Sequence, residues 1–107
     1  MENFNKLIGS STPVLVDFYA DWCGPCKAMS PAVQEVGKEV EGKARVIKVN
    51  IDKNQGAAMH YNVRAVPTFI IFKNGQQMWR HSGMIDKNTL EKQLLAFAWL
   101  TLLCFEL

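Results

Sequence analysis

The sequence of 107 residues predicts an α/β fold in which a central mixed β-sheet carries helices on both faces. Two observations lead to this fold class. Apolar runs of strand length alternate along the chain with segments of helical periodicity, which is typical of layered α/β domains. Farther along, Asn74-Gly75 separates two stretches rich in β-forming residues, and this dipeptide is a strong signal for a hairpin. The hairpin adds antiparallel neighbours, so the sheet is expected to be mixed.

The first half of the chain predicts a helix, a strand and a second helix. An apolar stripe over residues 4–8 has helical spacing, and the Ser-Ser-Thr-Pro sequence at 10–13 ends it. Val14–Tyr19 is almost continuously apolar, as expected of a strand covered on both faces. The following segment, Gly24–Val40, has apolar residues on one side and predicts a helix that Pro31 should kink.

The second half predicts three strands and two helices. Arg45–Ile51 reads as a second strand, and Gln55–Tyr61 as a short helix. Thr68–Phe72 and Met78–Ser82 flank the Asn-Gly pair as the arms of the hairpin. Asp86 can cap a last helix that begins directly after it. The sheet is therefore expected to contain four strands.

Length and composition fit one globular domain over residues 1–107. A net charge of +2, from 12 basic and 10 acidic residues, provides no field that would attract nucleic acid or an anionic membrane. No apolar run of secretory length occurs in Met1–Ser10, so we expect a protein of the reducing cytoplasm. Three cysteines, with Cys104 far from the other two, are too few for a secreted disulfide framework.

The residues best suited to catalysis lie where the first strand meets the second helix, in the segment Trp22-Cys23-Gly24-Pro25-Cys26-Lys27. Cys23 falls at the N-terminus of that helix, where free N–H groups and the helix dipole lower the pKa of a thiol. Pro25 fits the first helical turn because its missing N–H is not needed there. Cys26 lies one turn inside, close enough to attack a mixed disulfide on Cys23. We therefore expect Cys23 to be the nucleophile and Cys26 the resolving thiol.

Two other interpretations of the cysteine pair remain. A purely structural disulfide would contribute little to the stability of the fold, because the loop that it closes is short. A zinc site would need two further ligands, and Cys104, His60 and His81 do not stand at a spacing typical of structural zinc. The sequence therefore predicts no metal site and no bound cofactor.

With these residues in view, the chain resembles the thioredoxin family closely over about residues 4 to 95. The resemblance rests on five stretches in the family's order and spacing: Val14–Lys27, Lys48–Asp52, Val66–Thr68, Phe72–Gly75 and Ser82–Gly83. It implies the thioredoxin fold and a dithiol-disulfide oxidoreductase that reduces disulfide bonds in protein substrates. It also implies that NADPH supplies the electrons through a flavoprotein thioredoxin reductase, which the residues themselves do not reveal.

Asp17 interrupts the apolar strand that precedes Cys23, where a buried carboxylate is costly unless it is partnered or useful. Burial would raise its pKa, so that it can accept the proton of Cys26 as that thiol attacks, directly or through a water. The resemblance implies this role for Asp17. It also places Lys48 near the carboxylate, where a positive charge would partly offset the rise in pKa.

The resemblance implies a cis-proline loop at Val66-Pro67-Thr68, although X-Pro bonds in general are mostly trans. The backbone of this loop, with Val66 foremost, would pair with an extended substrate segment as an added strand. Together with Thr68, the residues expected to form a flat, mostly apolar docking surface are Trp22, Gly24, Pro25, Ala65, Val66, Pro67 and Gly83.

The sequence departs from the family at both ends. Family members begin with a strand before the first helix, but the 13 residues before Val14 read as helix and turn. That strand is therefore expected to be missing, which leaves Arg45–Ile51 as an unprotected edge of the sheet.

The tail from about 96 to 107 is apolar all round. Covering of the core or an edge is our first interpretation, self-association the second and interfacial membrane contact the third; an altered reading frame would also give such a tail.

The resulting prediction is a monomeric, cytoplasmic protein-disulfide reductase whose partners are thioredoxin reductase and disulfide-containing client proteins. Gly24-Pro25 between the cysteines favours a reductant over the nearest rival, an oxidant or isomerase with the same site. A protein of another class remains as an alternative: an interaction module that binds partners through Trp22 and Pro67 whatever its redox state.

Overall fold

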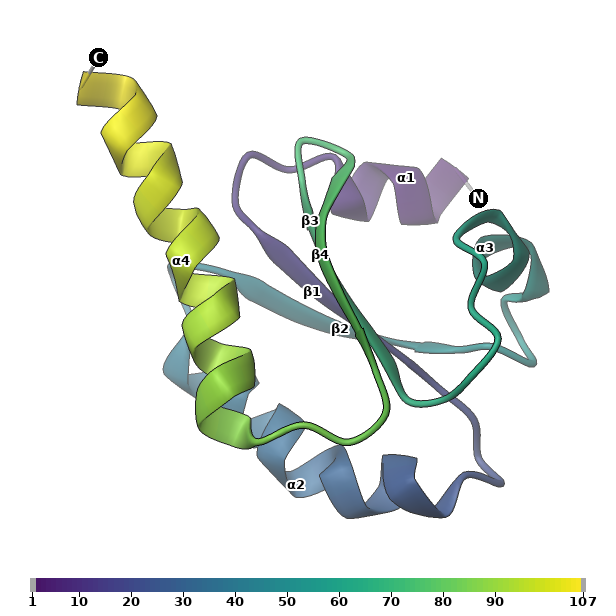
Figure 1. Ribbon diagram of the computed structural model, residues 1–107. Coiled ribbons are helices and arrows are strands. Elements are labelled where there is room, and N and C mark those ends of the chain that lie inside the picture. Colours follow the sequence, from purple (N-terminus) through teal and green to yellow (C-terminus); the bar gives the residue numbers. More distant parts are fainter. Residues whose placement is uncertain (1, 107) are drawn as a thin grey trace.

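The computed structural model describes the backbone of residues 2–106 and the side chains of residues 3–98. Helices and strands alternate before a final hairpin and helix (Figure 1). The elements are α1 Glu2–Ile8, β1 Val14–Tyr19, α2 Gly24–Glu39, β2 Arg45–Asn50, α3 Gln55–His60, β3 Thr68–Lys73, β4 Gln76–Ser82 and α4 Lys87–Glu106. The predicted order of elements is confirmed, and no strand precedes α1 within the described backbone.

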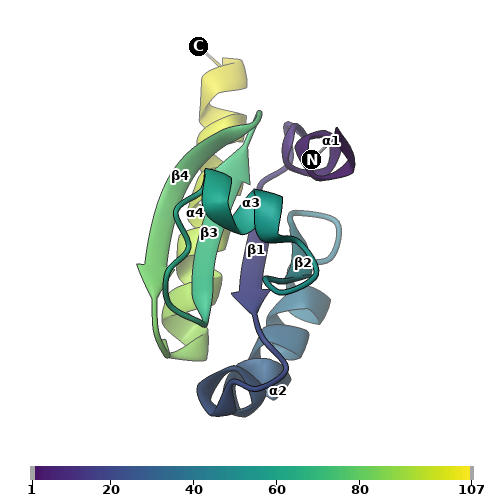
Figure 2. The same cartoon turned by 90° about the vertical axis from the view of Figure 1, so that its right-hand side faces the viewer.

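The four strands form one mixed sheet in the order β2-β1-β3-β4 (Figure 2). β1 is parallel to β2 and antiparallel to β3, and β4 is antiparallel to β3. The predicted four-stranded mixed sheet is thus confirmed, with β2 as one of its edges. The register sets Asp17 of β1 directly between Lys48 of β2 and Phe69 of β3.

Helices cover both faces of the sheet, as the sequence predicts. On one face, Leu15 of β1 packs with the apolar side of α2 and with Leu90 and Leu94 of α4. On the opposite face, the alternate residues of β1 pack with α1 and α3 (Figures 1 and 2). Because side chains alternate along a strand, Asp17 belongs to the same face as Leu15 and points towards the α2 layer.

The hairpin turn is built from two residues in the left-handed region, Asn74 with φ 54° and Gly75 with φ 81°. Such turns match the twist of the paired strands. Pairing therefore reaches the turn itself, and β4 begins at Gln76 rather than at Met78 as predicted. The polar, exposed residues 76 and 77 show no apolar alternation, and a register shift opposite Ile71 and Phe72 interrupts the pattern further.

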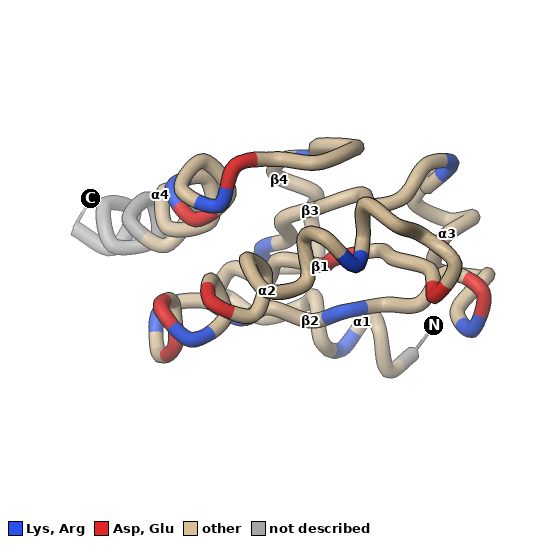
Figure 3. Tube along the Cα trace, turned by 90° about the horizontal axis from the view of Figure 1, so that it is seen from below, with Lys and Arg blue, Asp and Glu red and all other residues tan. Residues whose placement is uncertain are grey.

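The long helices lie where the sequence predicts them. α2 runs through Pro31, its C-cap residue is Val40, and the kink expected at Pro31 stays a prediction. At the start of α4, the Asp86 carboxylate accepts hydrogen bonds from the backbone N–H (3.0 Å) and hydroxyl (3.1 Å) of Thr89, which confirms the predicted cap. Basic and acidic residues are intermixed along α2 and α4, in keeping with the small net charge (Figure 3).

The apolar tail is helical through Glu106, but its side chains are described only to residue 98. Within that part, half-buried Phe97 packs against the core cluster on the α2 and α4 face of the sheet, and the Lys73 ammonium donates a hydrogen bond to the Phe97 carbonyl at 2.8 Å. What the side chains of residues 99–107 cover lies outside the described residues, so the predicted covering role stays a prediction. In the part of the chain that is described, none of the helices has the length and hydropathy required to cross a bilayer.

Candidate active site

The two cysteines meet at the junction of β1 and α2. Cys23 is the N-cap of α2, with extended backbone (φ −92°, ψ 109°), and Pro25 occupies the first turn of the helix. Cys23 and Cys26 are joined by a disulfide, with their Cα atoms 5.3 Å apart. The backbone N–H of Cys26 points back at the Cys23 sulfur and lies 3.1 Å from it.

This geometry favours negative charge on Cys23 in the reduced protein. The sulfur occupies the place where an N-cap side chain accepts a hydrogen bond from a free helical N–H, and the dipole of the 16-residue helix α2 adds to the effect. The same sulfur lies 3.7 Å from the carbonyl oxygen of Val66, which links the helix terminus to the loop before β3. Cys23 and Cys26 are both largely buried, so a reaction partner must approach along a defined face.

Asp17 is a buried carboxylate in the sheet behind the cysteines. It is only 3% exposed, and among the described residues its Oδ1 atom has no hydrogen-bond partner. Burial raises the pKa of Asp17 to about 6, and the charge of neighbouring Lys48 opposes part of that rise. A carboxyl group with this pKa exchanges its proton near neutral pH, as a proton acceptor for a thiol requires.

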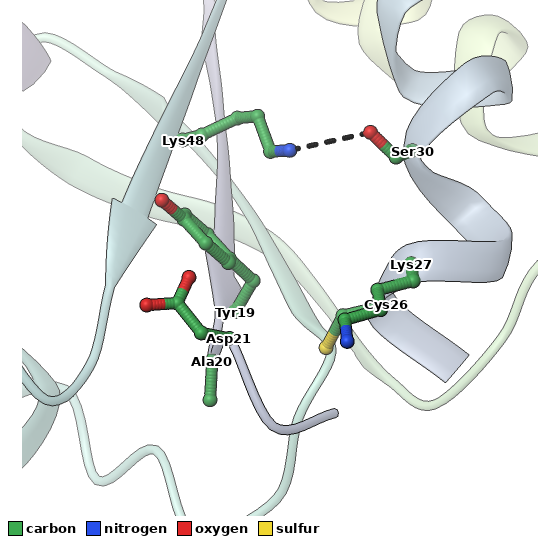
Figure 4. A pocket seen from close by; sticks show the side chains of 7 residues that line it. All are labelled: Tyr19, Ala20, Asp21, Cys26, Lys27, Ser30 and Lys48. Atoms are coloured by element: carbon green, nitrogen blue, oxygen red, sulfur yellow. Dashed lines mark hydrogen bonds between the residues drawn. The ribbon is translucent and has the colours of Figure 1, made fainter. Parts of the chain in front are cut away.

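A cavity of about 330 Å³ opens beside Cys26 (Figure 4). Its wall is made by Tyr19, Ala20, Asp21, Cys26, Lys27, Ser30 and Lys48. The ammonium of Lys48 donates a hydrogen bond to the Ser30 hydroxyl at 3.4 Å and lies 4.7 Å from the centre of the Tyr19 ring. Solvent can therefore reach the neighbourhood of Cys26, while Lys48 is held over the α2 face of the sheet. Sequence reasoning gave no role to Tyr19 or Ser30, because nothing in their local pattern signals this contact.

The Val66–Pro67 peptide bond is cis, as the family resemblance implies and against the general preference for trans. Gly83, with φ +96°, donates its backbone N–H to the Pro67 carbonyl at 2.8 Å. The end of β4 thus holds the loop that faces the cysteines. The positive φ explains why a glycine stands at position 83, since other residues are strained there.

One predicted substrate contact is wrong. The Thr68 side chain is fully buried, so it does not line the docking surface. Its hydroxyl donates to the carbonyl of Ala65 at 2.6 Å and lies 3.1 Å from the Ser82 hydroxyl. Thr68 therefore fixes the shape of the loop from inside. The expectation rested on its place next to Pro67, but β3 is a central strand whose residues 68–72 are all buried, so the side chain is covered whichever face it occupies.

The other docking candidates surround the cysteines at the surface. Trp22 is 68% exposed, Gly24, Pro25 and Ala65 are exposed, Val66 and Gly83 are half-buried, and Pro67 is buried beneath them. The neighbouring side chain of Met84 is 56% exposed and extends this apolar surface; it lacks a sequence signal of its own.

Asp52 is another residue to which the sequence analysis gives no role. Its carboxylate accepts a hydrogen bond from the Trp22 indole N–H at 3.0 Å, which orients the exposed ring. Here a signal existed: Trp22 follows β1 and Asp52 follows β2, and the carboxyl ends of two parallel strands lie at the same edge of a sheet. Among the residues that the structure describes, no group of three or more His, Cys, Asp or Glu side chains could hold a metal ion.

Comparison with known proteins decides the family. The thioredoxin family model matches residues 1–96. The chain belongs to the thioredoxin family. It is 46% identical over 85 residues to a thioredoxin of Rickettsia conorii, with 79% of this chain and 81% of the relative covered. It is 45% identical over 89 residues to thioredoxin 1 of a Nostoc species, with 83% of each chain covered.

Solved structures of thioredoxins agree with this assignment. A mutant thioredoxin from Halobacterium salinarum superimposes with a TM-score of 0.82 at 34% identity, covering 92% of this chain and 85% of the other. A Fasciola hepatica thioredoxin gives a TM-score of 0.81 at 35% identity, covering 90% and 92%. With its Cys23–Cys26 disulfide, this thioredoxin-family chain is a thiol-disulfide oxidoreductase.

Proposed function

We propose that this oxidoreductase works as a reductant of disulfide bonds in other proteins, with Cys23 as its nucleophile. The observation that carries the proposal is the place of the Cys23 sulfur, which caps α2 and accepts the Cys26 N–H at 3.1 Å. A thiolate is the species that attacks a disulfide, and this position stabilises a thiolate.

The reaction takes two exchange steps. The Cys23 thiolate attacks one sulfur of the client disulfide, which forms a mixed disulfide and releases the other client sulfur as a thiolate. Cys26 then loses its proton and attacks the Cys23 sulfur, which releases the second client thiol and closes the Cys23–Cys26 disulfide. The client gains two electrons, and the dithiol of this protein loses two.

We assign Asp17 as the group that accepts the proton of Cys26 in the second step. Its pKa of about 6 makes it ionised, and so able to accept a proton, at neutral pH. The cavity beside Cys26 has room for water, and Asp17 is paired in the sheet with Lys48 of the cavity wall. Lys48 acts as a positioning residue, because its charge keeps the pKa of Asp17 from rising farther.

Client proteins would dock on the apolar surface around the cysteines. The backbone of Val66 is placed to pair with an extended client segment, and Trp22, Gly24, Pro25, Ala65 and Gly83 would contact its side chains. Pro67 and Thr68 shape this surface from below. By family relationship, we propose that the protein acts in the cytoplasm as a monomer with no bound cofactor, and that a thioredoxin reductase returns it to the dithiol with electrons from NADPH.

Trapping tests the proposed roles. Cys26→Ser removes the resolving thiol, so clients should accumulate as mixed disulfides that separate only under reducing conditions. Cys23→Ser is the matched control and should trap none. Equal trapping by both variants, or none by either, would contradict the assignment. A Cys23→Ser, Cys26→Ser double variant that keeps full cellular activity would instead support an interaction module.

The reduction potential of the Cys23–Cys26 pair tests whether the protein acts as a reductant or as an oxidant. Equilibration with a defined thiol buffer, in a Cys104→Ser background that leaves one cysteine pair, should give a potential near or below roughly −250 mV. A value between about −120 and −180 mV would make the protein an oxidant or isomerase and would remove the cytoplasm as its expected compartment.

A further inference from the structure

The β2 edge of the sheet offers backbone groups that the described chain does not pair. β2 is the outermost strand and is paired with β1 on its other side. The N–H groups of Arg45 and Ile51 donate to carbonyls at the two ends of β1, at 3.0 and 2.9 Å, so the odd-numbered residues of β2 face β1. Since successive residues of a strand present their N–H and C=O to opposite sides, Val46 and Lys48 present theirs outward.

A groove runs along this edge on the α2 side of the sheet. It has a volume of about 420 Å³ and is lined by Ser30, Val33, Gln34, Gly37, Val46 and Lys48. Valine side chains from α2 and β2 form an apolar floor, and Gly37 adds no side chain beside Val46. Lys48 supplies a positive charge at one end. The groove therefore suits an apolar side chain next to an acidic one.

The outward backbone groups and the groove belong to the same residues of β2. Val46 packs towards the α2 cluster and Lys48 bonds to Ser30 of α2 (Figure 4), so both side chains lie on the groove face. A strand added at this edge would place every second side chain over the groove. Two positions two residues apart would then lie near Val46 and Lys48 in turn.

We propose that the β2 edge binds an extended segment of another protein as an additional strand, with an apolar side chain in the groove and a carboxylate two residues away beside Lys48. Arg45 and Lys48, both exposed, make this edge basic. Strand addition draws affinity from backbone hydrogen bonds and specificity from pockets for alternate side chains, and the β2 edge has both.

A second copy of this chain fits the edge less well. Symmetric antiparallel pairing of two β2 strands, centred on residue 46, 47 or 48, brings either the two Arg45 or the two Lys48 side chains opposite or diagonal to each other. Like charges in these positions destabilise strand pairing. The groove shares Ser30 and Lys48 with the wall of the cavity beside Cys26, but Trp22, Val66 and Gly83 of the client-docking surface do not line it.

The test uses the oxidised full chain, in which no thiol exchange occurs, and a cysteine-free seven-residue probe peptide. The peptide alternates threonine and valine and carries one glutamate two residues from a valine. We expect saturating peptide to slow hydrogen exchange of the Val46 and Lys48 amides at least tenfold, with those of Trp22 and Gly83 unchanged. Replacing the glutamate by lysine should weaken binding about two- to fivefold, the range of an exposed ion pair.

Two controls separate strand addition from other binding. N-methylation of alternate peptide amides should abolish binding for the set that faces β2 and preserve it for the other set. Val46→Pro removes an N–H that β1 does not use, which an edge strand tolerates, and should abolish binding, whereas Val46→Thr should retain it. If Val46→Pro unfolds, as circular dichroism would show, the two methylated peptides still decide whether the peptide pairs with the backbone of β2.

Three results would overturn the proposal. Protection confined to the surface around Trp22 would place the peptide at the docking surface instead. Equal binding of both methylated peptides would exclude backbone pairing. Protection of Val46 and Lys48 without peptide, rising with protein concentration together with a dimer in sedimentation, would make a second copy the occupant.

Discussion

Replacing Asp17 by asparagine should stabilise the protein at neutral pH and remove one part of its pH dependence. The carboxylate is 3% exposed, and burial raises its folded-state pKa from 3.8 to about 6. Below about pH 4 the group is neutral in both the folded and unfolded states and does not oppose folding. Above pH 6 it is ionised in both states, but only the folded state holds the charge away from water. The stability present at low pH is therefore lost as the pH rises through 6.

The size of this effect follows from the pKa difference. A difference of about 2 at 1.36 kcal/mol for each pKa unit gives a loss of ~3 kcal/mol between pH 4 and pH 7. Asparagine has nearly the same shape and no charge, so Asp17→Asn should escape the loss. With a urea dependence of about 2 kcal/mol per molar for a small protein, the unfolding midpoint of the variant should exceed that of the parent by roughly 1.5 M more at pH 7 than at pH 4.

Urea unfolding of the oxidised proteins from pH 3.5 to 8 measures this difference. Subtracting the unfolding midpoint of the parent from that of the variant cancels the titration of all other groups. This difference should rise with a sigmoid shape between about pH 4 and pH 7. Asp21→Asn is the matched control, since it makes the same substitution in the same region at an exposed side chain. A flat difference for Asp17→Asn would refute the reasoning that a desolvated carboxylate sits in the sheet.

Three further changes test other parts of the structure. Lys48→Met removes the charge that opposes the effect of burial, so the pKa of Asp17, followed by carbon NMR of its carboxyl group, should rise above about 6; an unchanged value would mean that Lys48 does not act on Asp17. Leu94→Ala empties a fully buried site between α4 and the sheet and should lower the free energy of unfolding by about 2–5 kcal/mol, whereas Leu95→Ala, at a half-buried site, should cost less; equal losses would contradict the described packing. Gly83→Ala forces a side chain to φ +96° and should cost about 1–2 kcal/mol even though no atom blocks the Cβ, as chemical denaturation would reveal.

Local signals predicted the elements well where one physical preference dominated. Val14–Tyr19 was predicted with its observed bounds because a continuous apolar run fits a strand buried on both faces. Asn74-Gly75 located the hairpin turn, since both residues must adopt positive φ. The start of β4 was missed because exposed Gln76 pairs with Lys73 for reasons of turn geometry, which leave no trace in hydropathy.

The site residues also divide into those with a local sequence signal and those set by tertiary contacts. Cys23 and Cys26 could be found from the sequence because their separation of three and their place at the start of a helix carry the chemistry. Asp17 stood out as a charge within an apolar strand. The burial of Thr68, the bond from Trp22 to Asp52 and the cavity walls of Tyr19 and Ser30 depend on how distant segments come together.

The sequence by itself determined the order of helices and strands, the cysteine pair at a helix N-terminus and the carboxylate behind it. Each of these follows from neighbours along the chain, where propensity and periodicity act. Only the tertiary structure decided the pKa of Asp17, the burial of Thr68 and the opening of the β2 edge beside a groove. These properties depend on which segment covers which, because desolvation, packing and unpaired backbone groups are set by neighbours in space.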